Sequence, residues 1–128
     1  MENSLVLDAS ALLALINQEP GGEEVFLHVD QAVISTVNLA EVGSKLTDRG
    51  IPPEEIRLKI SGFPLKVYPF DEQAALHVIS LRSKVPNHIS LADRACLALA
   101  AHLGVPAWTA DKVWATLNLF EPEIHLIR

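Results

Sequence analysis

Four acidic side chains lie next to short apolar runs that the sequence offers as strands, where they could share one chemical site. They are Asp8, Glu41, Asp93 and Asp111. In open parallel sheets, ligands bind beyond the carboxyl ends of the strands, so acids that follow strands are candidates for such a site. Two carboxylates about 5 Å apart repel each other by roughly 3 kcal/mol at an effective dielectric near 20. A cluster of four must therefore take up protons or cations.

The proposed ligand atoms are all carboxylate oxygens, which select a hard cation such as Mg²⁺ or Mn²⁺. Zinc has little support, because the five histidines include no pair spaced three or four residues apart. The hydroxyls of Ser10 and Thr109 flank two of the acids and are expected to orient them. Arg94 and Lys112 are basic neighbours that could meet the phosphates of a nucleic acid or form ion pairs with the acids.

Each acid also has an ordinary structural interpretation. Asp8 and Asp111 could each cap the helix that follows, and Asp93 could form a capping box with Ser90. Glu41 is harder to explain, because it stands among apolar residues that should pack inward, where an unpaired acid is costly. The prediction of a shared site therefore rests on the four acids taken together.

Short runs rich in Val, Ile and Leu alternate with segments of helical periodicity, which predicts an α/β fold with a parallel sheet. The predicted strands are Ser4–Leu7, Ala32–Ser35, Leu65–Tyr68, Ala107–Thr109 and Ile124–Ile127. The predicted helices are Ala9–Asn17, Gly22–Val29, Thr36–Arg49, Pro53–Ser61, Asp71–Ser83, Ser90–Leu103 and Lys112–Leu117. Gly50 and Gly104 stand where left-handed caps would end two of these helices. Lys66 and His125 are polar exceptions in strands otherwise suited to burial on both faces.

The composition predicts one folded domain over residues 1–128, since 49% of the residues are hydrophobic and 20% are charged. The single cysteine, Cys96, lies in an apolar run and is expected to be a core residue in a reducing compartment. Neither a signal peptide nor a long apolar run is evident, so we expect a soluble cytoplasmic protein. The net charge of −6 opposes nucleic-acid binding by surface charge alone. A metal held by the acids would reverse the local field.

Four segments along nearly the whole chain resemble, in order, the motifs of the PIN domain family, and in particular of its short VapC-type toxins. They are VLDASALLA at 6–14, ISTVNLAEV at 34–42, ISLADRACLALA at 89–100 and WTADKVW at 108–114. Each segment contains one of the four acids. One detail departs from the commonest pattern: Ala92 stands where many relatives have glycine, a mild change beside the third acid.

The resemblance implies a three-layer sandwich, in which a central five-stranded parallel sheet carries helices on both faces. It implies a metal-dependent endoribonuclease in which Asp8, Glu41, Asp93 and Asp111 hold one or two Mg²⁺ or Mn²⁺ ions. These ions would activate a water for hydrolysis of RNA phosphodiester bonds, with RNA also contacted by Arg94 or Lys112. The resemblance further implies a homodimer and a cognate VapB-type antitoxin that blocks the acidic groove.

Three alternatives compete with this interpretation. A receiver-like phosphoacceptor signalling domain has similar size and alternation, with acids matched by Asp8 and Asp71 and a hydroxyl near Thr109. It also needs paired acids after the first strand and a lysine after the last, whereas Asp8 has no acidic neighbour. A phosphatase with an aspartate nucleophile is disfavoured, because the second acid that it needs is replaced by Ser10. A PIN-fold binding module without catalysis remains open.

Overall fold

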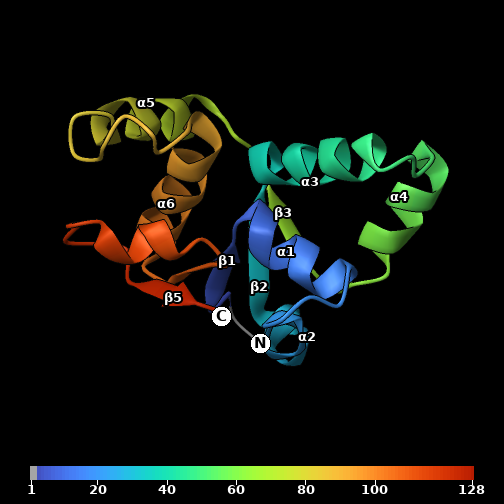
Figure 1. The fold of residues 1–128 in the computed structure, drawn as a ribbon. Coiled ribbons are helices and arrows are strands. Elements are labelled where there is room, and N and C mark those ends of the chain that lie inside the picture. The colour runs from blue at the N-terminus through green and yellow to red at the C-terminus, as the bar shows by residue number, and fades with distance from the viewer. Residues whose placement is uncertain (1–2) are drawn as a thin grey trace.

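Residues 3–128 are described by the structure, a computed structural model. Five strands form a parallel sheet in the order β3-β2-β1-β4-β5 (Figure 1). The strands are β1 (Leu5–Leu7), β2 (Ala32–Ser35), β3 (Lys66–Tyr68), β4 (Ala107–Thr109) and β5 (Ile124–Leu126). All five predicted strands are present, and their ends differ from the prediction by at most one residue.

Helices cover both faces of this sheet, as predicted (Figure 1). They are α1 (Ala9–Ile16), α2 (Gly22–His28), α3 (Thr36–Asp48), α4 (Pro53–Ser61), α5 (Glu72–Leu81) and α6 (Leu91–Leu103), with the 3₁₀ turns η1 (Val29–Gln31) and η2 (Lys112–Thr116). Buried side chains of α1 to α4 form one core, and those of α5 and α6 form the other. No helix among residues 3–128 combines the length and the apolar character needed to cross a bilayer.

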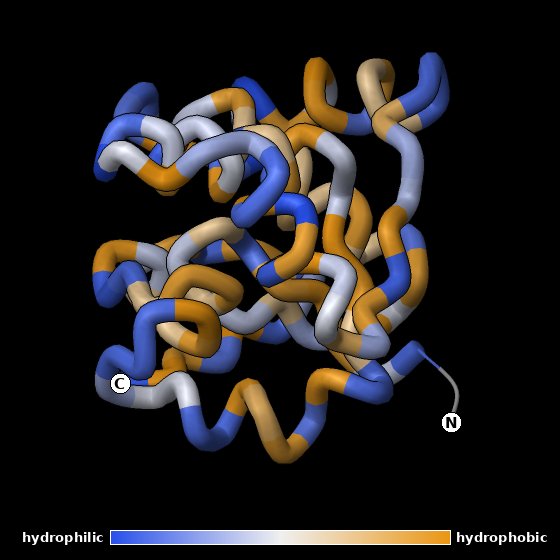
Figure 2. Tube along the Cα trace, turned by 90° about the vertical axis from the view of Figure 1, so that its right-hand side faces the viewer, coloured by the Kyte–Doolittle hydropathy of each residue, from blue (hydrophilic) through white to orange (hydrophobic). Residues whose placement is uncertain are grey.

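The two central strands divide their side chains between these cores. Leu5 and Leu7 of β1 pack in the core of α1 to α4, whereas Val6 packs in the core of α5 and α6. Ile34 and Val33 of β2 divide in the same way, since successive side chains of a strand point to opposite faces. Hydrophobic segments run through the middle of the molecule, with hydrophilic segments mostly in the outer turns (Figure 2). Continuous apolar strands are thus required at the centre of the sheet.

The two polar exceptions, Lys66 and His125, lie in the edge strands of the sheet. Lys66 lies in β3 and His125 in β5, which are the two edge strands, where one side of the strand has no neighbour.

The order β3-β2-β1-β4-β5 differs from the 2-1-3-4-5 order of receiver domains, in which β1 separates β2 from β3. The receiver alternative is therefore wrong.

The helix ends agree with the cap signals, with two exceptions. Gly50 and Gly104 adopt the left-handed conformation, with φ of 86° and 69°. The segment predicted as a helix from Lys112 to Leu117 is instead the 3₁₀ turn η2, because a single short turn tightens to i→i+3 bonds. Helix α5 is shorter than predicted at both ends, since Asp71 is its cap and the chain turns away after Leu81.

Candidate active site

Asp8 lies at the carboxyl end of β1, in the middle of the sheet, and is only 5% exposed. It caps α1, because its Oδ1 accepts a hydrogen bond from the Ala11 backbone amide at 2.8 Å. The Ser10 hydroxyl donates to the same oxygen at 2.7 Å, and the Thr109 hydroxyl of β4 donates to Oδ2 at 2.5 Å. Three donors from two elements therefore fix the orientation of this carboxylate.

Burial raises the pKa of Asp8 to about 6, because desolvation disfavours the charged carboxylate. The hydrogen bonds from Thr109, Ser10 and Ala11 lower the pKa and offset part of this effect, and the nearby charge of Asp93 raises it again. The ionised form of Asp8 is thus disfavoured by its surroundings. A cation bound beside Asp8 would stabilise this ionised form.

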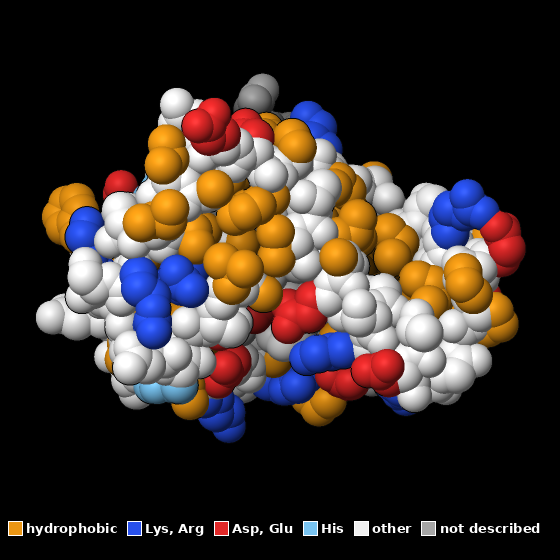
Figure 3. All heavy atoms as spheres, turned by 90° about the horizontal axis from the view of Figure 1, so that it is seen from above, with side chains coloured by type: hydrophobic (Ala, Val, Ile, Leu, Met, Phe, Trp, Pro, Cys, Tyr) orange, Lys and Arg blue, Asp and Glu red, His pale blue; other side chains and the backbone are white. Residues whose placement is uncertain are grey.

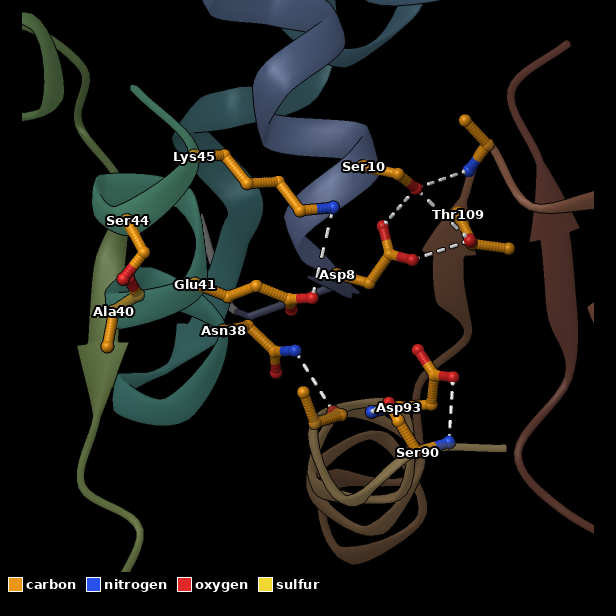
Figure 4. A network of polar contacts seen from close by, with 12 residues as sticks. Asp8, Ser10, Asn38, Ala40, Glu41, Ser44, Lys45, Ser90, Asp93 and Thr109 are labelled. Atoms are coloured by element: carbon orange, nitrogen blue, oxygen red, sulfur yellow. Dashed lines mark hydrogen bonds and ion pairs between the residues drawn. The ribbon is translucent and has the colours of Figure 1, made fainter. Parts of the chain in front are cut away.

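Glu41 and Asp93 approach Asp8 from two other helices. Glu41 lies in the second turn of α3, which follows β2, and its side chain is one-third exposed. Asp93 lies in the first turn of α6, where its Oδ2 accepts the Ser90 amide at 3.0 Å in the predicted capping box. Figure 4 shows the side chains of Glu41 and Asp93 extending toward Asp8, whose own carboxylate is turned toward Ser10 and Thr109.

The same three charges also act on the buried thiol of Cys96. Burial raises its pKa well above the usual value, and the charges of Asp8, Asp93 and Glu41 raise it further. Figure 3 shows the molecule from above the view of Figure 1. Acidic side chains lie near the middle of this face, with hydrophobic and basic side chains around them.

Asp111 and the two hydroxyls extend the network from β4. The Asp111 amide donates to Thr109 Oγ1 at 3.0 Å, and Ser10 Oγ accepts the amide of Ala110 at 2.9 Å. Thr109 is fully buried and links the Asp111 backbone to the Asp8 carboxylate. The Asp111 carboxylate caps η2 by accepting from the Val113 amide, and it is the Asp111 backbone amide that connects to Asp8 through Thr109.

The two basic candidates have different surroundings. The Arg94 guanidinium donates from Nη1 to the carbonyl of Val78 at 3.1 Å, and its Nε is buried. Arg94 therefore joins α6 to α5, and its contact with RNA phosphates stays a prediction. Lys112 is exposed, directly after Asp111.

Two polar residues near the acids were missed by sequence reasoning. Lys45 has its ammonium 4.0 Å from Glu41 Oε2 (Figure 4). Asn38 is 1% exposed, and its Nδ2 donates to the carbonyl of Ala92 at 3.0 Å. The helical spacing could have identified both residues. Asn38 lies three residues before Glu41 and Lys45 four residues after it, so all three share one side of a helix.

The donor set fits a hard divalent cation. Its members are carboxylate oxygens, hydroxyls and one amide oxygen, the ligand types of Mg²⁺ and Mn²⁺. Within residues 3–128, no three acidic, histidine or cysteine side chains stand close enough to hold one ion directly. Mg²⁺ usually keeps several waters and binds directly to only one or two carboxylates, so it does not require three such side chains at bonding distance. The buried Asp8 carboxylate and the unpaired Asn38 Oδ1 are the groups that such an ion would satisfy.

The fold is shared with several toxin–antitoxin proteins. A toxin–antitoxin complex from Klebsiella pneumoniae has a TM-score of 0.73 at 18% identity, over 98% of both chains. DNA-bound VapBC from Salmonella typhimurium has a TM-score of 0.73 at 20% identity, over 98% of both chains. VapC20 from Mycobacterium tuberculosis, described as a sarcin–ricin loop cleaving toxin, has a TM-score of 0.70 at 16% identity, over 93% of this chain and 100% of that one.

Comparison of the sequence with curated proteins gave no match. A sequence model described as the PIN domain matches residues 5–118, a span that includes Asp8, Glu41, Asp93 and Asp111. This span is nearly the whole chain, and its motifs fall on the carboxyl edge of the sheet described above. The chain therefore belongs to the PIN domain family.

Proposed function

We propose that this protein is an endoribonuclease that depends on Mg²⁺ or Mn²⁺, and that it is the toxin of a VapBC-type toxin–antitoxin pair. One observation carries the proposal: the side chains of Glu41 on α3 and Asp93 on α6 extend toward the buried Asp8 at the end of β1. No packing requirement brings three acids together, and their mutual repulsion opposes it. A site that binds a divalent cation explains why the fold tolerates that cost.

The chain's own residues have distinct roles in this proposal. Asp8, Glu41 and Asp93 would hold the cation directly or through its waters, and Asp111, the cap of η2, would contribute in the same way. A bound divalent ion supplies charge neutralisation at the scissile phosphate and a water of lowered pKa. Thr109 and Ser10 hold the Asp8 carboxylate in one orientation.

Basic residues near the acids supply the first attraction for RNA. The net charge of −6 repels a polyanion, so local cations matter more than the total. Lys45 and Lys112 lie beside Glu41 and Asp111, and both are exposed enough to meet a phosphate. Metal ions held by the acids would add further positive charge at the point of cleavage.

Apolar surfaces support the two protein partners that we propose. A groove between α3 and α4 is lined by Leu39, Ile56 and Ile60, and Ala40 on the same groove precedes Glu41. A VapB-type antitoxin segment in this groove would reach the acids. Exposed apolar residues on α5 support a homodimer. As a toxin of this class the protein would act in the cytoplasm, a reducing compartment that suits the lone Cys96.

Cleavage of RNA by purified wild-type protein and two variants tests the proposal. Asp8→Asn and Asp93→Asn should each abolish Mn²⁺-supported cleavage, a loss of at least 100-fold, while circular dichroism shows the fold unchanged. Asp71→Asn is the matched control, because Asp71 caps α5 through Ala74 as Asp8 caps α1 through Ala11. It should cleave as the wild type does.

Two results would reject the nuclease. Cleavage that persists in EDTA or in both variants would show a contaminant or another site. Wild-type protein that binds Mn²⁺ and an antitoxin but leaves RNA intact would favour the remaining alternative, a PIN-fold binding module without catalysis.

A further inference from the structure

Asn38 is buried between the helices that carry Glu41 and Asp93. It lies on α3 one turn before Glu41, and only 1% of its surface is exposed. Its Nδ2 donates to the carbonyl of Ala92, the residue before Asp93 in α6. The orientation of the amide is fixed by this bond, because the opposite flip would set two acceptor oxygens against each other. Asn38 thus ties together the two backbones that position Glu41 and Asp93.

The other half of the same amide has no partner. Asn38 Oδ1 is buried, and no donor in residues 3–128 reaches it. Leaving a buried acceptor without a hydrogen bond is costly, and in native proteins such an atom commonly marks a site for a water or an ion. The close view places the Asn38 side chain beside Glu41, in the space between α3 and the start of α6 (Figure 4).

We propose that Asn38 is a positioning residue of the metal site. This inference rests on the proposed metal-dependent function and adds a residue to it. Nδ2 ties the first turn of α3, before Glu41, to the start of α6, before Asp93, and Oδ1 would accept a hydrogen bond from a water of the bound cation. An amide suits both tasks, since it supplies an oxygen without a further negative charge and a donor that a carboxylate lacks.

Mn²⁺ binding to metal-free protein, measured by titration calorimetry, tests this role without any dependence on RNA cleavage. Asn38→Ala should weaken Mn²⁺ binding at least 10-fold, as loss of groups that orient metal ligands commonly does. Val42→Ala is the matched control, because Val42 is equally buried in α3 but belongs to the apolar core. It should lower the melting temperature yet keep the Kd within twofold of the wild type.

Asn38→Asp removes the donor, keeps an acceptor, and adds a negative charge that also favours a cation. It is nearly isosteric and keeps an oxygen at this position, but it lacks the donor to Ala92. We expect it to bind Mn²⁺ at least fivefold more tightly than Asn38→Ala, and to melt below the wild type when metal-free.

The outcomes distinguish this inference from the proposed function. Equal Mn²⁺ affinity in the wild type and Asn38→Ala would overturn the inference alone, as would equal affinity in the two Asn38 variants. Failure of the wild type to bind Mn²⁺ at all would overturn the metal-dependent function itself.

Discussion

Asp8 has two opposite effects on the stability of the metal-free protein. As a helix cap and the centre of a hydrogen-bond network, it stabilises the start of α1. As a buried charge it destabilises the fold, which is why its pKa is raised to about 6. An asparagine at this position would keep a cap acceptor and lose the charge. The acid is thus retained at a cost to stability, which is typical of functional sites.

The first prediction concerns the pH dependence of stability. Between pH 3.8 and about 6, the folded protein holds the Asp8 proton more tightly than the unfolded chain does. Ionisation as the pH rises through this window therefore lowers the free energy of unfolding, by on the order of 3 kcal/mol. Asp8→Asn should melt at a higher temperature than the wild type in EDTA at pH 7.5, and the two should converge near pH 4. A variant less stable than the wild type at pH 7.5 would contradict this.

Lys45 lets us separate a stability role from a substrate role. Its exposed ion pair with Glu41 should contribute less than about 1 kcal/mol to folding. Lys45→Ala should therefore leave the melting temperature nearly unchanged, but weaken RNA binding and reduce the salt dependence of log K by about one unit. Lys59→Ala is the control, since Lys59 makes a similar pair with Glu55 on α4. Identical RNA affinity in the two variants would exclude a phosphate contact by Lys45.

Helix α2 packs closely against α1 at Gly22. A Cβ added at Gly22, the first residue of α2, would lie 2.2 Å from the backbone oxygen of Ala14 in α1. A Cβ at Gly43, within α3, would meet no atom within 4 Å. The two glycines therefore differ in what they require of the fold.

Gly22→Ala should destabilise the protein by about 1–3 kcal/mol, because the helices must move apart. Gly43→Ala should stabilise it by about 0.5–1 kcal/mol, because alanine restricts the unfolded chain and open space surrounds the new methyl group. Urea unfolding of both variants measures the difference. Equal effects of the same sign would show that α1 and α2 do not pack as described.

The elements were largely predictable from sequence, whereas the polar contacts between them were not. Strands such as β1 and β2 are buried on both faces, so their apolar runs are continuous and easy to find. Caps are local, so Gly50, Gly104 and the pairing of Ser90 with Asp93 could be read directly. The bonds of Asn38 and Arg94 join residues 54 and 16 positions apart, and such pairs depend on how helices pack.

For the whole molecule, the unpaired apolar surface of α5 is the feature that predicts assembly. Leu76 and Ile79 are 56% and 66% exposed, and they lie three residues apart on one side of the helix. We expect the wild type to be a dimer by light scattering and Ile79→Glu to shift it to a monomer. Leu58→Glu, at a residue of α4 that is 70% exposed, should leave the mass unchanged. A monomeric wild type at tens of micromolar would contradict the proposed homodimer.

Charge also acts at this scale, since the whole chain is acidic while its proposed substrate is a polyanion. A divalent cation at the carboxyl edge of the sheet resolves that conflict. Locating this cation tests the proposed metal site. In a crystal soaked with Mn²⁺, anomalous scattering should place the ion in the space between Asp8, Glu41 and Asp93, coordinated by at least one of them. Mn²⁺ ordered only elsewhere, or absent there at millimolar concentration, would contradict the metal site and the nuclease built on it.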